Sequence, residues 1–227
     1  MAESIAQSDT DDARRPALRR FLAALELDLA DGAGTATAPG GAAMLRGFAQ
    51  LLRSVDTTDL GRGARASRER LAVCRFWDAA LQAASGRVQP LAAVLRVLGP
   101  ALSWTQNPNY RRRPPDATFL DNYGYAVIAG PSDGPPALAA HPRLALGVLL
   151  LGPHAHYPLH AHPAVEVYYT LTSGGEWWRD PGPWRDEPAG TAICHEPYAR
   201  HATRAGRSPL LAVYLWRGDL ATHATLA

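Results

Sequence analysis

The spacing of apolar positions divides the chain near residue 100. In the first part, apolar residues recur every three or four positions, as they do on one face of an amphipathic helix. The clearest case is the segment 14–32, which ends at Gly32 and has apolar residues at Leu18, Phe21, Leu22, Leu25 and Leu29. The same spacing of apolar residues recurs in the segments 40–55, 65–86 and 89–99. The pattern predicts a helical region over residues 13–103, preceded by a polar tail over residues 1–12 that we expect to be disordered.

After about Trp104 the pattern changes to short segments that are rich in β-branched and aromatic residues and are separated by Pro, Gly and Asp turns. These segments are 122–130, 143–152, 165–174, 176–180, 190–197 and 209–218. We interpret residues 131–142 as a loop. Several short strands with such turns are typical of a sandwich or barrel. The sequence therefore predicts a β-barrel domain over residues 104–227, with the helical region packed on it.

Composition and charge narrow the classes of function. The net charge is +2, with no long block of like charges, so we expect no nucleic-acid or membrane partner. All 23 basic residues are arginine, which excludes chemistry on a lysine Schiff base. The longest apolar run, 144–152, is too short to span a bilayer, and the N-terminus lacks the apolar segment of a secretory signal. With only two cysteines, Cys74 and Cys194, we expect reduced thiols and a cytoplasmic protein.

One segment, HAHYPLHAHPAVEVYYTL, contains four histidines, a glutamate and three tyrosines, and its residue pattern is otherwise typical of a β-strand. Because side chains alternate faces along a strand, His160 and His162 share one face, as do Glu166 and Tyr168. A hairpin at 163–164 would bring both pairs to the same interior. A carboxylate buried beside two imidazoles is costly unless a cation lies among them. These donors suit one divalent transition metal such as Zn, Mn, Fe, Co or Ni.

The spacing His160-x-His162-x3-Glu166, followed by a glycine turn, resembles the first conserved motif of the cupins. The resemblance implies a mainly β fold, a cupin jelly-roll barrel (double-stranded β-helix) with one metal inside, here with a helical N-terminal region. Cupins add one more histidine after a proline–glycine turn, and His195 and His201 both follow such a turn. We favour His201 as the last ligand because it starts the next strand, where cupins place it. His195 would then contact the metal ligands without binding the metal, or have a purely structural role.

Within the cupins, residues 156–178, 195–202 and 209–220 resemble the dimethylsulfoniopropionate (DMSP) lyases, most of all the DddL type. The resemblance covers roughly residues 120–220, with Tyr157 before the first ligands and the pair Glu166-x-Tyr168 after them. It implies a metal-dependent carbon–sulfur lyase that cleaves DMSP to dimethyl sulfide and acrylate. The reaction removes the proton next to a metal-bound carboxylate, followed by β-elimination. From this resemblance we assign Tyr157 as the base and place Tyr168 near or on the metal.

A sulfonium cation needs a site without a competing nucleophile, and aromatic faces provide one. The sequence offers four candidates for this role, which are Trp177, Trp178, Tyr123 and Tyr125. Trp177 and Trp178 are adjacent on a predicted strand, so only one of them can face inward. Three successive arginines, 111–113, would attract an anion, but we interpret them as part of a solvated loop.

Other functions fit the same ligand set. A cupin dioxygenase would use iron and O₂, and a non-catalytic cupin would only bind a small ligand. A cupin sugar isomerase is a weaker alternative. The residues leave open the native metal, the choice between His195 and His201, and which tyrosine is the base. We expect a small-molecule substrate and allow for a homodimer.

Overall fold

The computed structural model describes residues 2–32, 40–58, 60 and 70–227, with side chains of the first helix from residue 13 onward. The N-terminal part is helical, as the apolar spacing predicts. Its elements are α1 (Ala2–Gly32), α2 (Gly41–Arg53), η1 (Ala72–Phe76), α3 (Trp77–Ala83), η2 (Gly86–Val88), α4 (Gln89–Leu98) and η3 (Gly99–Ala101). The predicted helix 65–86 is divided between η1 and α3, and residues 65–69 lie outside the described residues.

Helix α1 begins at Ala2 and therefore includes residues 2–12, for which the polar sequence led us to expect a disordered tail. No Gly or Pro occurs in this segment, and nothing in it stops a helix that is anchored further along. From Leu18 to Leu29, the apolar side of α1 is buried against the rest of the protein, as the spacing predicts.

The remainder of the chain is mainly strand. Its elements are β1 (Trp104–Thr105), α5 (Pro108–Arg112), η4 (Phe119–Asn122), β2 (Tyr123–Gly130), β3 (Ala137–Ala140), β4 (Ala145–Leu151), β5 (His156–Ala161), β6 (Val165–Thr170), β7 (Gly175–Arg179), β8 (Arg185–Asp186), β9 (Ala192–His195), β10 (His201–Ala205), β11 (Leu210–Arg217) and β12 (Thr225–Leu226). Strand β3 lies within the segment 131–142 that we interpreted as a loop, where its small residues pair in parallel with β2.

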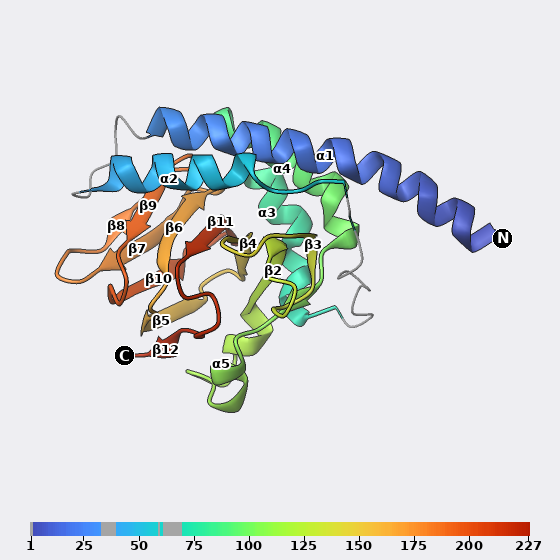
Figure 1. Cartoon of the computed structure of the whole chain (residues 1–227). Helices are drawn as coiled ribbons and strands as arrows, with labels where there is room; N and C mark the ends of the chain where they lie inside the picture. The colour runs from blue at the N-terminus through green and yellow to red at the C-terminus, as the bar shows by residue number, and fades with distance from the viewer. Residues whose placement is uncertain (1, 33–39, 59, 61–69) are drawn as a thin grey trace.

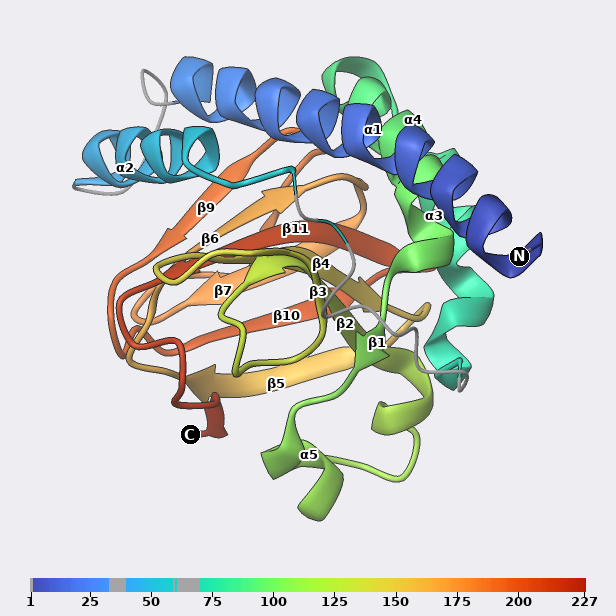
Figure 2. The ribbon, with the colours of Figure 1, turned by 45° about the vertical axis from the view of Figure 1, so that its right-hand side comes forward.

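The strands form two sheets that lie face to face (Figures 1 and 2). The seven-stranded sheet has the order β1-β2-β4-β11-β6-β9, with β3 beside β2, and the five-stranded sheet has the order β12-β5-β10-β7-β8. Every pair along these two orders is antiparallel. The helices α1 and α2 cover the outer face of the larger sheet (Figure 1). This is the jelly-roll barrel with a helical N-terminal region that the sequence predicts, and the fold class is confirmed.

The larger sheet is buried on both faces, because the helices cover one face and the smaller sheet covers the other. On β6, Val167 and Tyr169 belong to the core shared with the helices, whereas Tyr168 belongs to the core inside the barrel. Strand β4 is buried along nearly its whole length. This explains why β4 has a continuous apolar run and no polar alternation.

Strands β5 and β6 differ from the predicted hairpin, because they belong to opposite sheets. Strand β5 pairs with β10 and β12, whereas β6 pairs with β11 and β9. The turn at 162–164 therefore crosses from one sheet to the other. His160 and His162 still lie close to Glu166 and Tyr168, since the inner faces of both sheets border the same interior.

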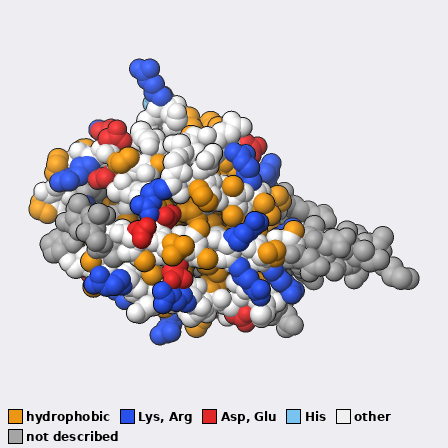
Figure 3. All heavy atoms as spheres, turned by 90° about the horizontal axis from the view of Figure 1, so that it is seen from above, with side chains coloured by type: hydrophobic (Ala, Val, Ile, Leu, Met, Phe, Trp, Pro, Cys, Tyr) orange, Lys and Arg blue, Asp and Glu red, His pale blue; other side chains and the backbone are white. Residues whose placement is uncertain are grey.

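On the outer face of the helical layer, arginine and acidic side chains are interspersed, without a patch of one sign (Figure 3). Two ion pairs on this side link Arg53 to Glu26 and Arg87 to Asp28. Among the described residues, no helix combines the length and the apolar character needed to cross a bilayer.

Candidate metal centre and active site

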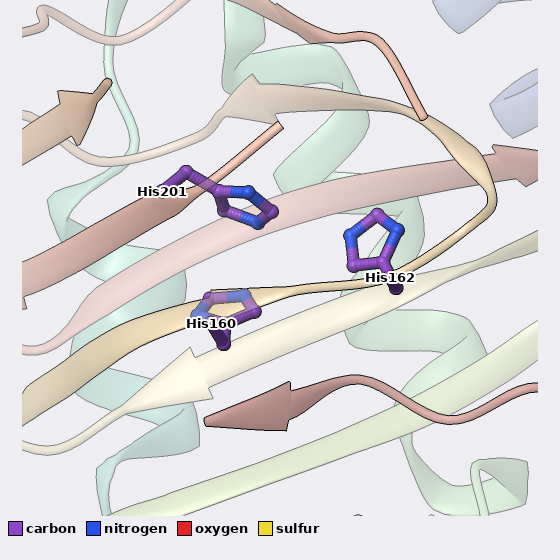
Figure 4. Close-up of side chains that lie close together, drawn as sticks. All are labelled: His160, His162 and His201. Carbon is purple, nitrogen blue, oxygen red and sulfur yellow. The ribbon is translucent and has the colours of Figure 1, made fainter. Parts of the chain in front are cut away.

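Three histidines converge inside the barrel from two neighbouring strands (Figure 4). His160 lies on β5, His162 lies just after β5, and His201 begins β10. His201 is the direct cross-strand partner of His160. One nitrogen of each ring lies within 4.8 Å of a nitrogen of the others, and all three residues are buried. The structure therefore brings together His160 and His162, which the motif spacing selected, and His201, which the resemblance to the cupins favoured.

Each of these rings is oriented by a hydrogen bond from Nδ1 to a backbone carbonyl. His160 donates to Pro158 at 2.8 Å, His162 to Ala164 at 3.0 Å, and His201 to Ala199 at 2.8 Å. In a neutral imidazole, a protonated Nδ1 leaves Nε2 with its lone pair free. Metal-binding histidines are held in this way, with the second ring nitrogen bonded to an oxygen. The three Nε2 atoms are thus prepared as ligands.

Glu166 joins the histidines from β6 of the opposite sheet, and its side chain is fully buried. Its Oε2 atom lies 3.1 Å from Nε2 of His162 and 3.1 Å from Nε2 of His201. Burial by itself would raise the pKa of Glu166, but His162 and His201 outweigh it and hold that pKa well below its usual value. The carboxylate therefore stays ionised next to the imidazoles.

The donor set fits a divalent metal ion. Nε2 of His160 is buried and has no hydrogen-bond partner among the described residues, and Nε2 of His201 faces the Glu166 carboxylate at 3.1 Å. Burial lowers the pKa of His160 well below its usual value, so this ring is neutral and offers a lone pair. Buried polar atoms without a partner are costly. Imidazoles around a carboxylate suit a cation such as zinc, iron or manganese.

His195 lies next to this set, as the direct cross-strand partner of Glu166. Its ring stacks on that of His201 at 4.0 Å between centroids and 14° between planes, and both of its buried nitrogens lack a partner among the described residues. Ring lone pairs lie in the ring plane, so two stacked rings cannot both direct one at the same ion. One ligand atom each of Glu166, His195 and His201 also lies within 4.8 Å of the others, so either histidine, but not both, can complete the ligand set. The choice of His201 as ligand stays our prediction.

The two tyrosines assigned to catalysis have different neighbours. The ring of Tyr157 stacks on His160 at 4.0 Å, and its hydroxyl lies 3.3 Å from the Tyr110 hydroxyl. The Tyr157 hydroxyl also hydrogen-bonds with Tyr123. Tyr168 instead hydrogen-bonds with Glu166. Burial raises the pKa of both Tyr157 and Tyr168 well above the usual value for tyrosine.

A cavity of about 770 Å³ opens beside these residues and is lined by Tyr157, Glu166 and Tyr168. Tyr123 and Tyr125, two of the four predicted substrate-binding residues, also line it. The two tryptophans are not among the lining residues. Trp177 is buried and packs on Tyr168 at 5.0 Å, whereas Trp178 is half-buried on the other face of β7. One of the pair faces inward, as the alternation predicts.

Several aromatic residues at the site were not identified from the sequence. Tyr214 and Trp216 line the cavity from β11, and Tyr110 reaches the site from α5. Tyr214 and Trp216 are two residues apart on an otherwise apolar strand, and this period-2 aromatic pair is the signal that could have revealed them. Tyr110 stands next to three arginines and has no such signal. Arg111 is exposed and lines the cavity, which the interpretation as a solvated loop did not include.

Comparisons with known proteins identify the family. Residues 43–212 match the family model described as dimethylsulfoniopropionate lyase. The dimethylsulfoniopropionate lyase DddQ of Ruegeria pomeroyi is 34% identical over 110 residues, which cover 48% of this chain and 53% of that protein. The putative dimethylsulfoniopropionate lyase DddL of Cereibacter sphaeroides is 31% identical over 135 residues, 59% of this chain and 53% of that one. The matched region thus spans about half the length of these curated relatives.

Solved structures show the same fold over nearly the whole chain. The crystal structure of DMSP lyase DddQ from Ruegeria pomeroyi DSS-3 has a TM-score of 0.70 and 24% identity, covering 93% of this chain and 96% of that one. A chain from the crystal structures of the DMSP lyases RdDddP and RnDddQII has a TM-score of 0.67 and 24% identity, covering 94% and 99%. Because the family model spans most of the sequence, this protein belongs to the dimethylsulfoniopropionate lyase family.

Proposed function

We propose that the protein is a metal-dependent carbon–sulfur lyase that cleaves DMSP to dimethyl sulfide and acrylate. The observation that carries this proposal is the buried cluster of imidazoles and one carboxylate that borders a cavity lined with tyrosine hydroxyls. Membership of the family supports the substrate, and the ligand geometry supports dependence on a metal. The cluster offers ligands for a metal and the tyrosines offer candidate bases, which are the two functions that the reaction requires.

The reaction is a β-elimination. A base removes the proton from the carbon next to the substrate carboxylate, and the electron pair of that C–H bond forms the new double bond. The C–S bond breaks and its pair leaves with sulfur, so the products are acrylate, neutral dimethyl sulfide and a proton held by the base. The difficulty is the proton, which is weakly acidic beside a group that already carries negative charge.

His160, His162, Glu166 and His201 would hold the ion in this proposal. A bound divalent cation supplies charge that stabilises the carbanion developing next to the substrate carboxylate. The protein itself orients the three imidazoles through backbone carbonyls and keeps Glu166 ionised. Because all four side chains are buried, water competes little for these ligands.

Tyr157 is the proposed base. Its hydroxyl donates to the hydroxyl of Tyr110 and hydrogen-bonds with Tyr123, and once Tyr157 has lost its proton both neighbours can turn to donate to the phenolate. Burial opposes ionisation, so a cation nearby must offset it. Tyr168 is the alternative base, because its hydrogen bond with Glu166 places its oxygen beside a proposed metal ligand. We assign Tyr168 to the surroundings of the metal and Tyr157 to proton removal.

The dimethylsulfonium group would lie against the aromatic rings of the cavity. Tyr123 and Tyr125 line it and are retained for this role, and each cation–π contact is worth about 0.5–2 kcal/mol. Trp177 and Trp178 are less suitable than we predicted, because neither lines the cavity. The inner surface of β11 supplies Tyr214 and Trp216 in their place.

The test is a headspace assay for dimethyl sulfide from purified protein and DMSP, with and without a chelator and in the absence of oxygen. We expect dimethyl sulfide to form anaerobically, to stop on chelation and to return when a divalent metal is added. A requirement for iron and O₂ would favour the dioxygenase alternative. Binding of DMSP without turnover would favour the non-catalytic cupin. The cytoplasmic location and a homodimer stay predictions of the sequence.

A further inference from the structure

We propose that Trp216 is a positioning residue for the metal centre, which holds Glu166 so that one carboxylate oxygen faces the histidines. The inference rests on the proposed function, because it assumes that Glu166 binds the metal. It assigns a role to a residue outside the four ligands and the two catalytic tyrosines. The argument depends on two separate contacts of one indole ring.

The first contact is a hydrogen bond to the carboxylate. Trp216 Nε1 donates to Oε1 of Glu166 at 2.5 Å. The two residues are direct cross-strand partners on β11 and β6, so the sheet itself sets their separation. Oε1 is thereby occupied by a donor whose backbone position is set by the pairing of the two strands. The other oxygen, Oε2, is the one that lies 3.1 Å from Nε2 of His162 and of His201.

The second contact is between rings. The indole of Trp216 lies 4.2 Å from the imidazole of His162, at 31° between the planes. Trp216 therefore packs against the ring of a second proposed ligand, whose Nδ1 is already bonded to the Ala164 carbonyl. One side chain thus fixes the direction of the carboxylate and supports a neighbouring imidazole. Outer partners of this kind are generally worth 10–100-fold in metal affinity or activity.

Without the indole N–H, Oε1 of Glu166 would be buried without a donor. Glu166 is fully buried, and a Phe ring offers no donor in place of the indole N–H. The carboxylate would then turn to share its oxygens differently between the metal and the neighbouring rings. This turn weakens binding of the ion, and it changes the ligand field that the ion experiences.

The chain offers a matched control in Trp177. This residue is buried inside the barrel, against whose core Trp216 is partly buried, and it packs on Tyr168. Its Nε1 has no partner among the described residues, and it makes no recorded contact with Glu166 or His162. The substitution Trp177→Phe removes the same atoms from the same core, without touching the proposed ligands.

The experiment measures the binding of Zn²⁺ alone to the metal-free full chain, by competition with a chromogenic chelator. We expect Trp216→Phe to raise the dissociation constant by about 10–100-fold, and Trp177→Phe to change it less than about twofold. In the Co²⁺-loaded proteins, the visible absorption bands should shift for Trp216→Phe and stay in place for Trp177→Phe. Circular dichroism checks folding, and the pair Trp216→Leu and Trp177→Leu repeats the test if the Phe variant of Trp216 does not fold.

Equal Zn²⁺ affinity in wild type and Trp216→Phe would overturn the inference, as would an equal loss in both Phe variants. Wild-type protein that binds no Zn²⁺ would overturn it together with the metal centre. The measurement uses no DMSP. If Zn²⁺ binding depends on Trp216 but no dimethyl sulfide forms, the positioning role stands and the proposed lyase activity fails.

Discussion

The substitution Tyr157→Phe tests the proposed base most directly, because it removes a single oxygen atom. The ring that stacks on His160 at 4.0 Å is kept, so the shape of the cavity wall is preserved. Only the hydrogen bonds of the hydroxyl, to Tyr110 and to Tyr123, are lost. Any large change in turnover must then come from the missing oxygen.

The structure allows the two effects of this change to be separated by size. Loss of a neutral hydrogen bond costs about 1 kcal/mol of stability, and for a chain of this length each kcal/mol lowers Tm by about 2–4 °C. Loss of a general base lowers the rate by about 10²-fold or more, which corresponds to about 2.7 kcal/mol in the barrier. We expect a modest decrease in Tm, a large loss of turnover and normal metal content.

The assay compares dimethyl sulfide production, metal content by elemental analysis and Tm in wild type, Tyr157→Phe and Tyr168→Phe. Because Tyr168 hydrogen-bonds with Glu166, its loss should perturb metal binding as well as rate. The reasoning is refuted if Tyr157→Phe keeps near-normal turnover. If Tyr168→Phe is then inactive with metal still bound, the roles of the two tyrosines are reversed.

Three further predictions follow from the packing and the site. His201→Ala should lower the metal content and remove the rise in Tm that saturating metal gives, whereas His195→Ala should keep most of that rise. At a metal concentration of a hundred times Kd, the rise corresponds to about 2.7 kcal/mol of stability. Full metal occupancy in His201→Ala would show that another residue is the fourth ligand. Gly147→Ala should lower the free energy of unfolding by about 1–3 kcal/mol in a urea titration, because the added Cβ would lie 2.2 Å from the backbone oxygen of Ala126. An unchanged free energy of unfolding would show that the strands can separate there. Thiol titration of the unfolded, unreduced protein should detect both cysteines, since both are free and buried in the fold, and finding none would indicate a disulfide.

The sequence by itself indicated the helical and strand regions and three of the proposed ligands, because these depend on local spacing, whereas the jelly-roll barrel and His201 came from the resemblance to the cupins. The period of the apolar residues separates helix from strand, and the alternation along β5 and β6 places His160, His162 and Glu166 on inward faces whichever sheet each strand joins. For the same reason, the sequence predicted that only one of Trp177 and Trp178 faces inward. It could not say that the inward one, Trp177, lies outside the cavity lining.

The tertiary structure decided everything that depends on pairing between distant segments. The assignment of β5 and β6 to opposite sheets follows from their partners β10 and β11, which no local pattern reveals. Tyr110 meets Tyr157 across 47 residues, and Trp216 meets Glu166 across 50. Residues at such separations are brought together by the register of the strands and by core packing. The contacts of Tyr110 with Tyr157 and of Trp216 with Glu166 therefore became visible only in the folded chain.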